Sequence, residues 1–147
     1  MRSLRPVALL LLVFFLAGCE GLSVENGGPR LDNTCLVKAD EPHRSTTSRH
    51  QEIVGKGWFT CSVPLQDGTL VVELQRRSGG DWEPAEMRDL EVKPVPARKK
   101  SLLPVPTPCT DGTFRTAARL SAHDANGAFA QSPWYYSRSR TDPCGKR

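Results

Sequence analysis

Apolar and polar residues alternate along two stretches of the chain, which is the pattern of half-buried β-strands. From Thr69 to Arg77, one side of the predicted strand carries Leu70, Val72 and Leu74. From Thr113 to Ala122, apolar or small residues again take every second position: Phe114, Thr116, Ala118, Leu120 and Ala122. Each stretch follows an Asp-Gly pair, which favours a tight turn. We therefore predict two central strands whose inner faces form the core.

Shorter stretches predict the remaining strands. We expect strands over 34–38, 57–63, 82–92 and 128–140, and a loop over 39–52, where no periodicity is visible. Pro84 favours an edge position for the 82–92 strand. Gly79-Gly80 and Asn126-Gly127 are typical of hairpin turns.

A proline-rich segment separates the two halves of the predicted domain. Residues 93–108 hold five prolines and the basic run Arg98-Lys99-Lys100. We interpret this segment as an extended, polyproline-like crossover between two sheets, with Leu102, Leu103 and Val105 tucked under it. A proline-rich ligand for a partner domain is the alternative.

About seven short strands separated by turns predict an all-β fold, an antiparallel sandwich of two sheets. Residues 112–127 resemble the sixth strand and following turn of fibronectin type III and immunoglobulin-like domains. Residues 70–82 similarly resemble their third strand and hairpin. The resemblance implies an immunoglobulin-like sandwich over residues 34–144.

The first nineteen residues predict export. Arg2 and Arg5 precede an unbroken apolar run over 7–16, which is typical of a signal peptide and too short to span a bilayer. The sequence Leu16-Ala17-Gly18-Cys19 resembles the lipobox of bacterial lipoproteins. The resemblance implies that residues 1–18 are removed and that Cys19 carries a diacylglycerol, because two or more acyl chains together give a stable anchor where one would not. Ordinary cleavage near Ala17 or Gly18 is the alternative.

These assignments divide the chain into four parts. A signal peptide covers residues 1–18, a flexible, glycine-containing tether covers 19–33, the sandwich covers 34–144, and a short tail covers 145–147. The predicted location is the extracytoplasmic side of a cell membrane, with the lipid on Cys19 as the membrane contact.

Four cysteines remain for the domain, an even number in an exported protein, and they predict two disulfides. In a sandwich, the first strand begins at the end where the second strand ends, which brings Cys35 close to Cys61. The same argument places Cys109 near Cys144, so we favour these two pairs. Pairing Cys35 with Cys144 and Cys61 with Cys109 is the alternative.

Charge and composition narrow the function classes. The predicted mature chain has a formal net charge of +2, which argues against a nucleic-acid binder. Residues 19–92 carry −5 and residues 93–147 carry +7, so the two halves either neutralise each other or leave a basic face for an anionic partner. Without ligand-like spacing, we interpret His43, His50 and His123 as solvated loop residues, and we expect neither a metal nor another cofactor.

No nucleophile motif or phosphate-binding loop occurs in the sequence, and we predict that the protein is not an enzyme. A cluster of acidic residues could suggest a glycosidase, but exposed alternation favours a charged surface: Asp81, Glu83, Glu86, Asp89 and Glu91.

Arginines and aromatic residues on the last two strands form the candidate binding surface. Arg115 and Arg119 project from one strand, and on the next strand four residues share a phase: Trp134, Tyr136, Arg138 and Arg140. If that phase is the outer one, guanidinium groups and rings interleave on one face, suited to phosphate, carboxylate or sugar. The structural alternative is a cross-strand ladder in which Glu73 pairs with Arg115 or Arg119. A second alternative turns Trp134 and Tyr136 into the core.

Three functions follow from these features. The first is a lipid-anchored binding or interaction module of the cell envelope, whose partner is an anionic envelope polymer or another exported protein. The second is a secreted inhibitor of extracellular hydrolases that uses residues 105–109 as a rigid loop. The third is an accessory domain that stabilises an envelope complex.

Overall fold

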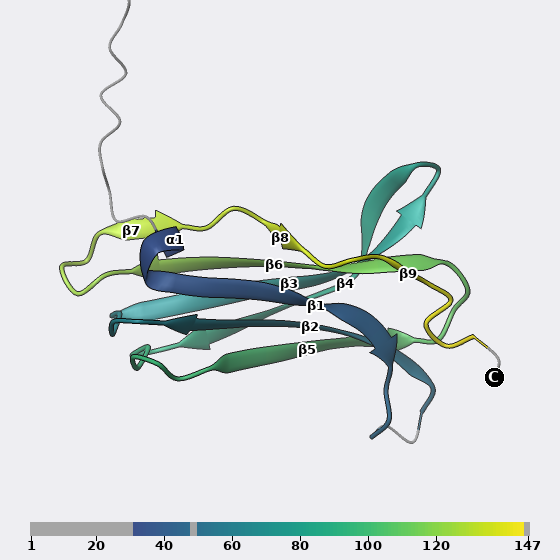
Figure 1. Cartoon of the computed structure of the whole chain (residues 1–147), viewed down its shortest axis with the longest axis horizontal. Helices are drawn as coiled ribbons and strands as arrows, with labels where there is room; N and C mark the ends of the chain where they lie inside the picture. The colour runs from purple at the N-terminus through teal and green to yellow at the C-terminus, as the bar shows by residue number, and fades with distance from the viewer. Residues whose placement is uncertain (1–30, 48–49, 146–147) are drawn as a thin grey trace, which may run out of the picture.

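The computed structural model describes residues 31–47 and 50–145. The signal peptide, the lipidation site Cys19, residues 19–30 of the tether and residues 146–147 lie outside these residues. Within the described part, the chain forms two antiparallel sheets that pack face to face (Figure 1). The prediction of an all-β, immunoglobulin-like sandwich with two disulfides is confirmed.

The smaller sheet has three strands in the order β1-β2-β5. They are β1 (Cys35–Arg44), β2 (Glu52–Cys61) and β5 (Ser101–Pro108). The larger sheet has the order β4-β3-β6-β7, with β8 and β9 also paired to β6. Its strands are β3 (Asp67–Ser78), β4 (Asp81–Val92), β6 (Thr113–His123), β7 (Phe129–Gln131), β8 (Tyr135–Tyr136) and β9 (Arg140–Thr141). As predicted from Pro84, β4 lies at an edge of its sheet.

The core lies between the two sheets and is built from the alternating positions that the sequence predicts. Leu70, Val72 and Leu74 of β3 are fully buried, and they face Phe59 of β2 and Val105 of β5 across the sandwich. Two glycines on the core side of β2 allow the sheets to approach closely. A Cβ on Gly55 would lie 2.7 Å from Thr116 Oγ1, and one on Gly57 would collide with Val72.

The first strand is longer than predicted. Residues 39–44 continue β1 and pair with β2, although their polar composition predicts a loop. A register shift between Asp40 and His43 interrupts the pairing, and such a bulge at a sheet edge hides the period-2 pattern. His43 therefore lies half-buried in a strand, and His123 ends β6, so only His50 of the three histidines lies outside a strand, as predicted.

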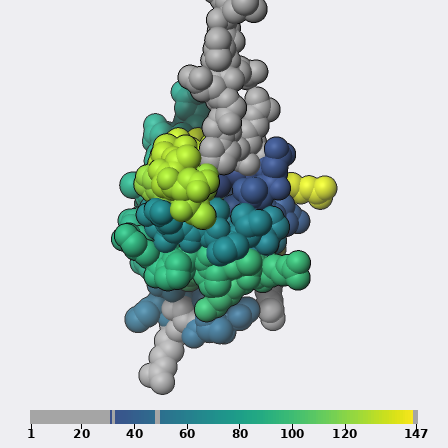
Figure 2. All heavy atoms as spheres, turned by 90° about the vertical axis from the view of Figure 1, so that its left-hand side faces the viewer, coloured from purple at the N-terminus to yellow at the C-terminus, as the bar shows by residue number. Residues whose placement is uncertain are grey.

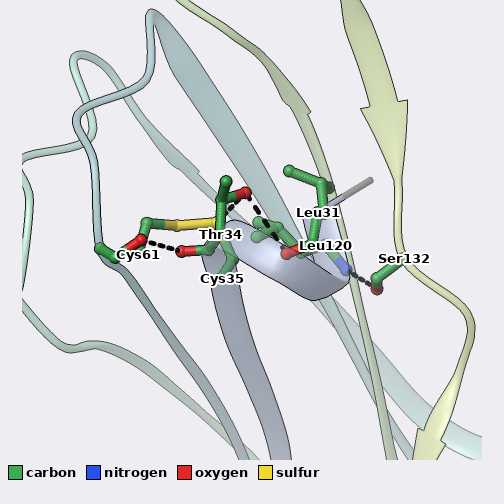
Figure 3. Close-up of a disulfide and its surroundings, with 7 residues drawn as sticks. Leu31, Thr34, Cys35, Cys61, Leu120 and Ser132 are labelled. Carbon is green, nitrogen blue, oxygen red and sulfur yellow. Dashed lines mark hydrogen bonds between the residues drawn. A yellow bond between two sulfur atoms is a disulfide. The ribbon is translucent and has the colours of Figure 1, made fainter. Parts of the chain in front are cut away.

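The described fold begins before the predicted boundary. Leu31–Thr34 forms a single helical turn, α1, and Leu31 is buried in the core cluster. Figure 3 shows Leu31 and Thr34 beside the disulfide between Cys35 and Cys61. Residues 31–33, which the sequence assigns to the tether, thus belong to the domain.

The proline-rich segment divides into two parts. Residues 93–100 cross from β4 in one sheet to β5 in the other, as predicted. Residues 101–108 are a strand rather than a polyproline-like segment, and Leu102 is exposed instead of tucked under. Pro104, Pro106 and Pro108 alternate, so their nitrogens, which carry no hydrogen, lie on the side away from β2, and the residues between them can bond to it. The alternation makes these prolines compatible with an edge strand.

The disulfides have the favoured pairing. Cys35 and Cys61 are directly opposite each other on β1 and β2, with their Cα atoms 4.0 Å apart. Cys109 precedes β6 and joins Cys144, which follows β9, with a Cα separation of 5.9 Å. The second disulfide ties the end of the last strand to the start of β6.

A carboxylate and a histidine connect the start of β3 to the end of β6. Asp67 Oδ1 accepts the backbone N–H of His123 at 3.1 Å and lies 2.8 Å from Nδ1 of the same residue. The side-chain hydrogen bond with His123 is the main cause that lowers the pKa of Asp67 below its ordinary value of 3.8. The backbone bond to His123 and the positive charges of His123 and Lys93 act in the same direction, against partial desolvation.

The lowered pKa of Asp67 predicts an acid-dependent part of the stability. Because the folded state holds a proton on Asp67 less readily than the unfolded state, this contribution is complete above about pH 4 and is lost as the pH falls through the folded-state pKa. We expect Asp67→Asn to lower the free energy of unfolding at pH 7, and the difference from wild type to shrink at pH 3. Urea unfolding followed by tryptophan fluorescence measures both differences.

His123→Gln is the matched control for this experiment, because it removes the largest cause of the shift. In that background, Asp67→Asn should show a much weaker pH dependence. A difference between Asp67→Asn and wild type that stays constant from pH 7 to pH 3 would contradict the assignment.

Candidate binding face on the larger sheet

The last strand of the sandwich is broken into three pieces. Gln131 pairs with Ser121, Tyr136 with Ala117, and Arg140 with Phe114, so the strand gains one residue between β7 and β8 and another between β8 and β9. Each inserted residue is a bulge that interrupts the backbone ladder. The sequence predicts one continuous strand over 128–140, and this prediction is wrong because the inserted residues leave no mark in the alternation.

A serine stands at each interruption and bonds to β6 in the same way. Ser132 donates its N–H to the carbonyl of Leu120, and its hydroxyl oxygen accepts the N–H of Leu120 at 3.0 Å (Figure 3). Ser137 makes the same two bonds with Thr116, the second at 2.9 Å. The serine hydroxyls thus replace the backbone carbonyls that would otherwise accept these two buried donors.

The interruptions decide which side chains of the last strand face outwards. Tyr136 lies opposite Ala117, whose side chain is on the outer side of β6, and the same register places Trp134 beside Arg119. Arg140 lies opposite Phe114, a core residue, so it does not share the phase of Tyr136. The expectation of one common phase is therefore wrong for Arg140.

Guanidinium groups and aromatic rings stack on the outer side of the larger sheet. Arg115 Cζ lies 4.1 Å from the centre of the Tyr136 ring and 4.4 Å from the centre of the Trp82 ring. Arg119 Cζ lies 4.5 Å from the centre of the Trp134 ring. We call this set the arginine–aromatic face: Trp82, Arg115, Arg119, Trp134 and Tyr136.

Hydrogen bonds hold Arg115 in this position. Its Nε donates to Gln75 Oε1 at 2.8 Å, and Gln75 Nε2 donates to Glu73 Oε2 at 2.6 Å. Gln75 is only 8 % exposed, so the amide that links the two charged side chains is largely shielded from water. The predicted pairing of Glu73 with Arg115 thus occurs through Gln75.

Arg119 is held less completely than Arg115. Its Nε is buried and has no hydrogen-bond partner in the described part of the chain. One ring of Trp134 packs against the guanidinium group, which is a favourable contact but satisfies no N–H donor. Arg119 therefore retains an unused donor below the surface of this face.

The structure brings together four of the six predicted site residues: Arg115, Arg119, Trp134 and Tyr136. Arg138 is exposed between β8 and β9, and Arg140 is exposed but out of phase. Sequence reasoning missed Trp82 and Gln75, because their contribution depends on the order β4-β3-β6, which brings three separate strands side by side. Gln75 lies opposite Arg115 because β3 pairs with β6, and no local sequence pattern indicates the register of these two distant strands.

A second stacked cluster lies on the outer side of the smaller sheet. Lys100 Nζ lies 3.9 Å and Lys38 Nζ 5.7 Å from the centre of the Trp58 ring. The indole nitrogen of Trp58 donates to Asp40 Oδ1 at 3.1 Å. The sequence places Trp58 on an outer face but does not indicate the two lysines. Both sheets therefore present aromatic rings with cations on their exposed sides.

The described residues contain neither a membrane-spanning helix nor a metal-binding cluster. Within residues 31–47 and 50–145, no helix has the length and apolar character needed to cross a membrane. The same residues contain no group of three or more His, Cys, Asp or Glu side chains that could hold a metal ion.

Comparisons with known proteins assign no family. No protein-family model and no curated protein sequence matches the chain. Two solved structures show a weak likeness, a crystal structure of the CARDB domain of the PF1109 protein from Pyrococcus furiosus in complex with di-metal ions, and a solution NMR structure of the same domain. Both are 10 % identical to this chain and cover 71 % of it, with 90 % and 95 % of their own lengths matched and TM-scores of 0.36 and 0.35. A likeness at this level supports no conclusion about the site.

The stacking of Arg115 predicts that lysine cannot replace it. Arg115→Lys keeps the positive charge but loses the planar group between two rings and the bond from Nε to Gln75. We expect the free energy of unfolding to fall by about 1–2 kcal/mol, from two weakened cation–π contacts and one lost hydrogen bond. Chemical unfolding followed by circular dichroism measures the change.

Arg138→Lys is the matched control, since the same substitution occurs at an exposed position outside the stack. We expect this variant to stay within about 0.5 kcal/mol of wild type. Equal effects of the two substitutions would show that the stacking does not stabilise the domain.

Proposed function

We propose that this chain is a non-catalytic binding module, held on the extracytoplasmic side of a cell membrane by lipid on Cys19. Its recognition surface is the arginine–aromatic face together with the exposed Arg138, and its partner is an anionic polymer of the cell envelope. The observation that carries the proposal is the stack of Arg115 between Tyr136 and Trp82 on an exposed sheet face.

The anchor rests on the sequence and on the cysteine pairing. The chain has five cysteines, and the four within the domain form two disulfides. Cys19 is left without a disulfide role and ends a lipobox-like sequence. The two acyl chains of a diacylglycerol supply enough buried hydrocarbon for stable membrane attachment.

The face suits a polymer with repeated negative charges. Arg115 contacts the rings of Tyr136 and Trp82 and has its Nε bonded to Gln75, so it acts mainly as a support that fixes the surrounding side chains. Tyr136 is 51 % exposed, and Arg138, two residues further along the chain, is also exposed, which leaves a ring and a guanidinium group available to a ligand. Because the stack is already formed, binding costs little further ordering of the supporting side chains.

The competing functions receive less support. The acidic residues of β4 are mostly exposed, and the half-buried Glu86 lies 4.0 Å from Arg88 Nε, which fits a charged surface better than a catalytic pair of carboxyl groups. Residues 105–108 are paired with β2 within a sheet, so they do not form the rigid free loop that the inhibitor hypothesis requires.

The anchor predicts the intact mass of the protein recovered from membranes. We expect the mass of residues 19–147 plus acyl chains, rising by about 4 Da on reduction as two disulfides open. Cys19→Ser should abolish the acyl mass and with it the membrane attachment that survives washing with high salt. A wild-type protein that carries no lipid and collects in the medium would contradict the anchor.

The recognition surface predicts salt-sensitive binding to anionic polymers. Residues 19–147 carrying Cys19→Ser should bind poly(glycerol phosphate) or polygalacturonate in calorimetry, with an affinity that falls steeply as salt is raised. We expect Arg138→Gln to weaken binding about two- to fivefold, the range for one exposed charge contact.

Arg44→Gln is the matched control, because it removes the same charge at an exposed position on the other sheet. This variant should bind like wild type. Absence of polymer binding, equal losses for both variants, or salt-insensitive capture of an exported protein instead would contradict the polymer assignment.

A further inference from the structure

The smaller sheet exposes apolar side chains at one end of its outer side. Leu36 of β1 is 50 % exposed and Leu102 of β5 is 43 % exposed, although both lie on regular strands. Between them runs β2, on which Trp58 lies directly opposite both Leu102 and Lys38. We call this set the apolar–basic corner: Leu36, Lys38, Trp58, Lys100 and Leu102.

The charges of the corner are positive. Lys100 and Lys38 both contact the Trp58 ring, and both are exposed. Asp40 is the nearby carboxylate that bonds to the Trp58 indole, which fixes the ring. The corner therefore combines exposed hydrocarbon with ammonium groups around a fixed tryptophan.

The corner lies at the end of the sandwich where the described chain begins. Leu36 is five residues from Leu31, the first described residue, and Lys100 ends the crossover that carries Arg98 and Lys99. Figure 2 views this end of the molecule and shows the start of the described chain in dark blue and the crossover in green on the same end. Residues 20–30 separate Cys19 from Leu31 and reach at most about 40 Å when extended.

We propose that the apolar–basic corner docks the domain onto an anionic lipid surface. The proposal rests on the lipid anchor of the proposed function, which keeps this end of the domain within reach of the membrane. Lysines near an anionic surface are attracted to the headgroups, while tryptophan and leucine side chains enter the boundary between headgroups and acyl chains. The corner supplies both kinds of side chain in one place.

Charge argues against a second copy of the chain as the occupant. Two copies that met through this corner would bring two lysines of each copy together with a single carboxylate, Asp40, whose Oδ1 already accepts the Trp58 indole N–H, and the excess of positive charge is unfavourable. An anionic lipid surface instead offers negative headgroups and a hydrocarbon layer together.

Docking through the corner would also orient the domain. The corner lies on the outer side of the smaller sheet, and the arginine–aromatic face lies on the outer side of the larger one, so the two surfaces point in opposite directions. A domain that rests on the corner would present the arginine–aromatic face away from the membrane, towards polymers of the envelope.

Vesicle binding tests the proposal without the acyl chains. Residues 19–147 with Cys19→Ser should sediment with phosphatidylcholine vesicles that contain about 30 mol % phosphatidylglycerol and not with pure phosphatidylcholine. The pair Lys38→Glu and Lys100→Glu should lower the partition coefficient at least about tenfold. The pair Leu36→Ser and Leu102→Ser, which leaves the charge unchanged, should lower it about tenfold or more through lost apolar contact.

Arg77→Glu with Arg88→Glu is the matched control, because it makes the same change in net charge at exposed positions of the opposite sheet, outside the proposed recognition surface. This control should lower the partition coefficient less than about threefold. Thermal unfolding of each variant identifies any loss of binding that comes from misfolding. If the pair Lys38→Glu and Lys100→Glu is unfolded, it is replaced by Lys38→Gln with Lys100→Gln.

Three outcomes would overturn the docking proposal. They are no binding of the starting protein to anionic vesicles, an equal loss in the control pair, and a dimer in ultracentrifugation that Leu36→Ser with Leu102→Ser abolishes. None of these changes the intact mass of the membrane-extracted protein or the effect of Arg138→Gln on polymer binding, so failure of docking is distinguishable from failure of the anchor or of polymer recognition.

Discussion

The segment from β7 to β9 pairs with β6 but contains two more residues than the paired part of β6. The way in which the backbone accommodates these two inserted residues decides which side chains lie on the exposed side of the larger sheet. Two serines replace the missing carbonyls, and the stack on Arg115 and Arg119 fastens the short pieces between them. Backbone pairing over two residues in β8 would hold such a piece only weakly. The aromatic and arginine side chains therefore stabilise the last strand whether or not a ligand binds.

The structural role of the stack also limits which side chains can contact a ligand. A guanidinium group that contacts two rings and is bonded through its Nε has little freedom, which makes Arg115 a fixed support rather than an adaptable contact. The exposed side chains of Tyr136 and Arg138 remain free to adjust to a ligand. On the opposite sheet, Trp58 has a comparable role, because its fixed ring positions two lysines among exposed leucines. The domain thus presents two basic surfaces on opposite sides, and the accompanying side chains distinguish them.

The sequence alone predicts the parts of this fold in which the strands pair regularly, without bulges. The alternation over 69–77 and 113–122 identifies the buried faces of β3 and β6, and the cysteine positions favour the observed pairs once a sandwich is assumed. The pattern fails where the backbone is irregular. The bulge near Asp40 hides the second half of β1, and the single residue inserted between β8 and β9 turns Arg140 out of phase with Tyr136. Trp82 could not be assigned to the stack because strand order, not local pattern, brings it to Arg115.

The alternating prolines of β5 have a consequence for the behaviour of many copies side by side. An open strand edge normally offers N–H donors to a neighbouring chain, and identical chains held at high density are the most exposed to such edge-to-edge growth. Pro104, Pro106 and Pro108 remove those donors from the free side of β5, so no second strand can complete a hydrogen-bonded ladder there. Copies crowded in two dimensions would then remain separate molecules along this edge instead of joining into a continuous sheet.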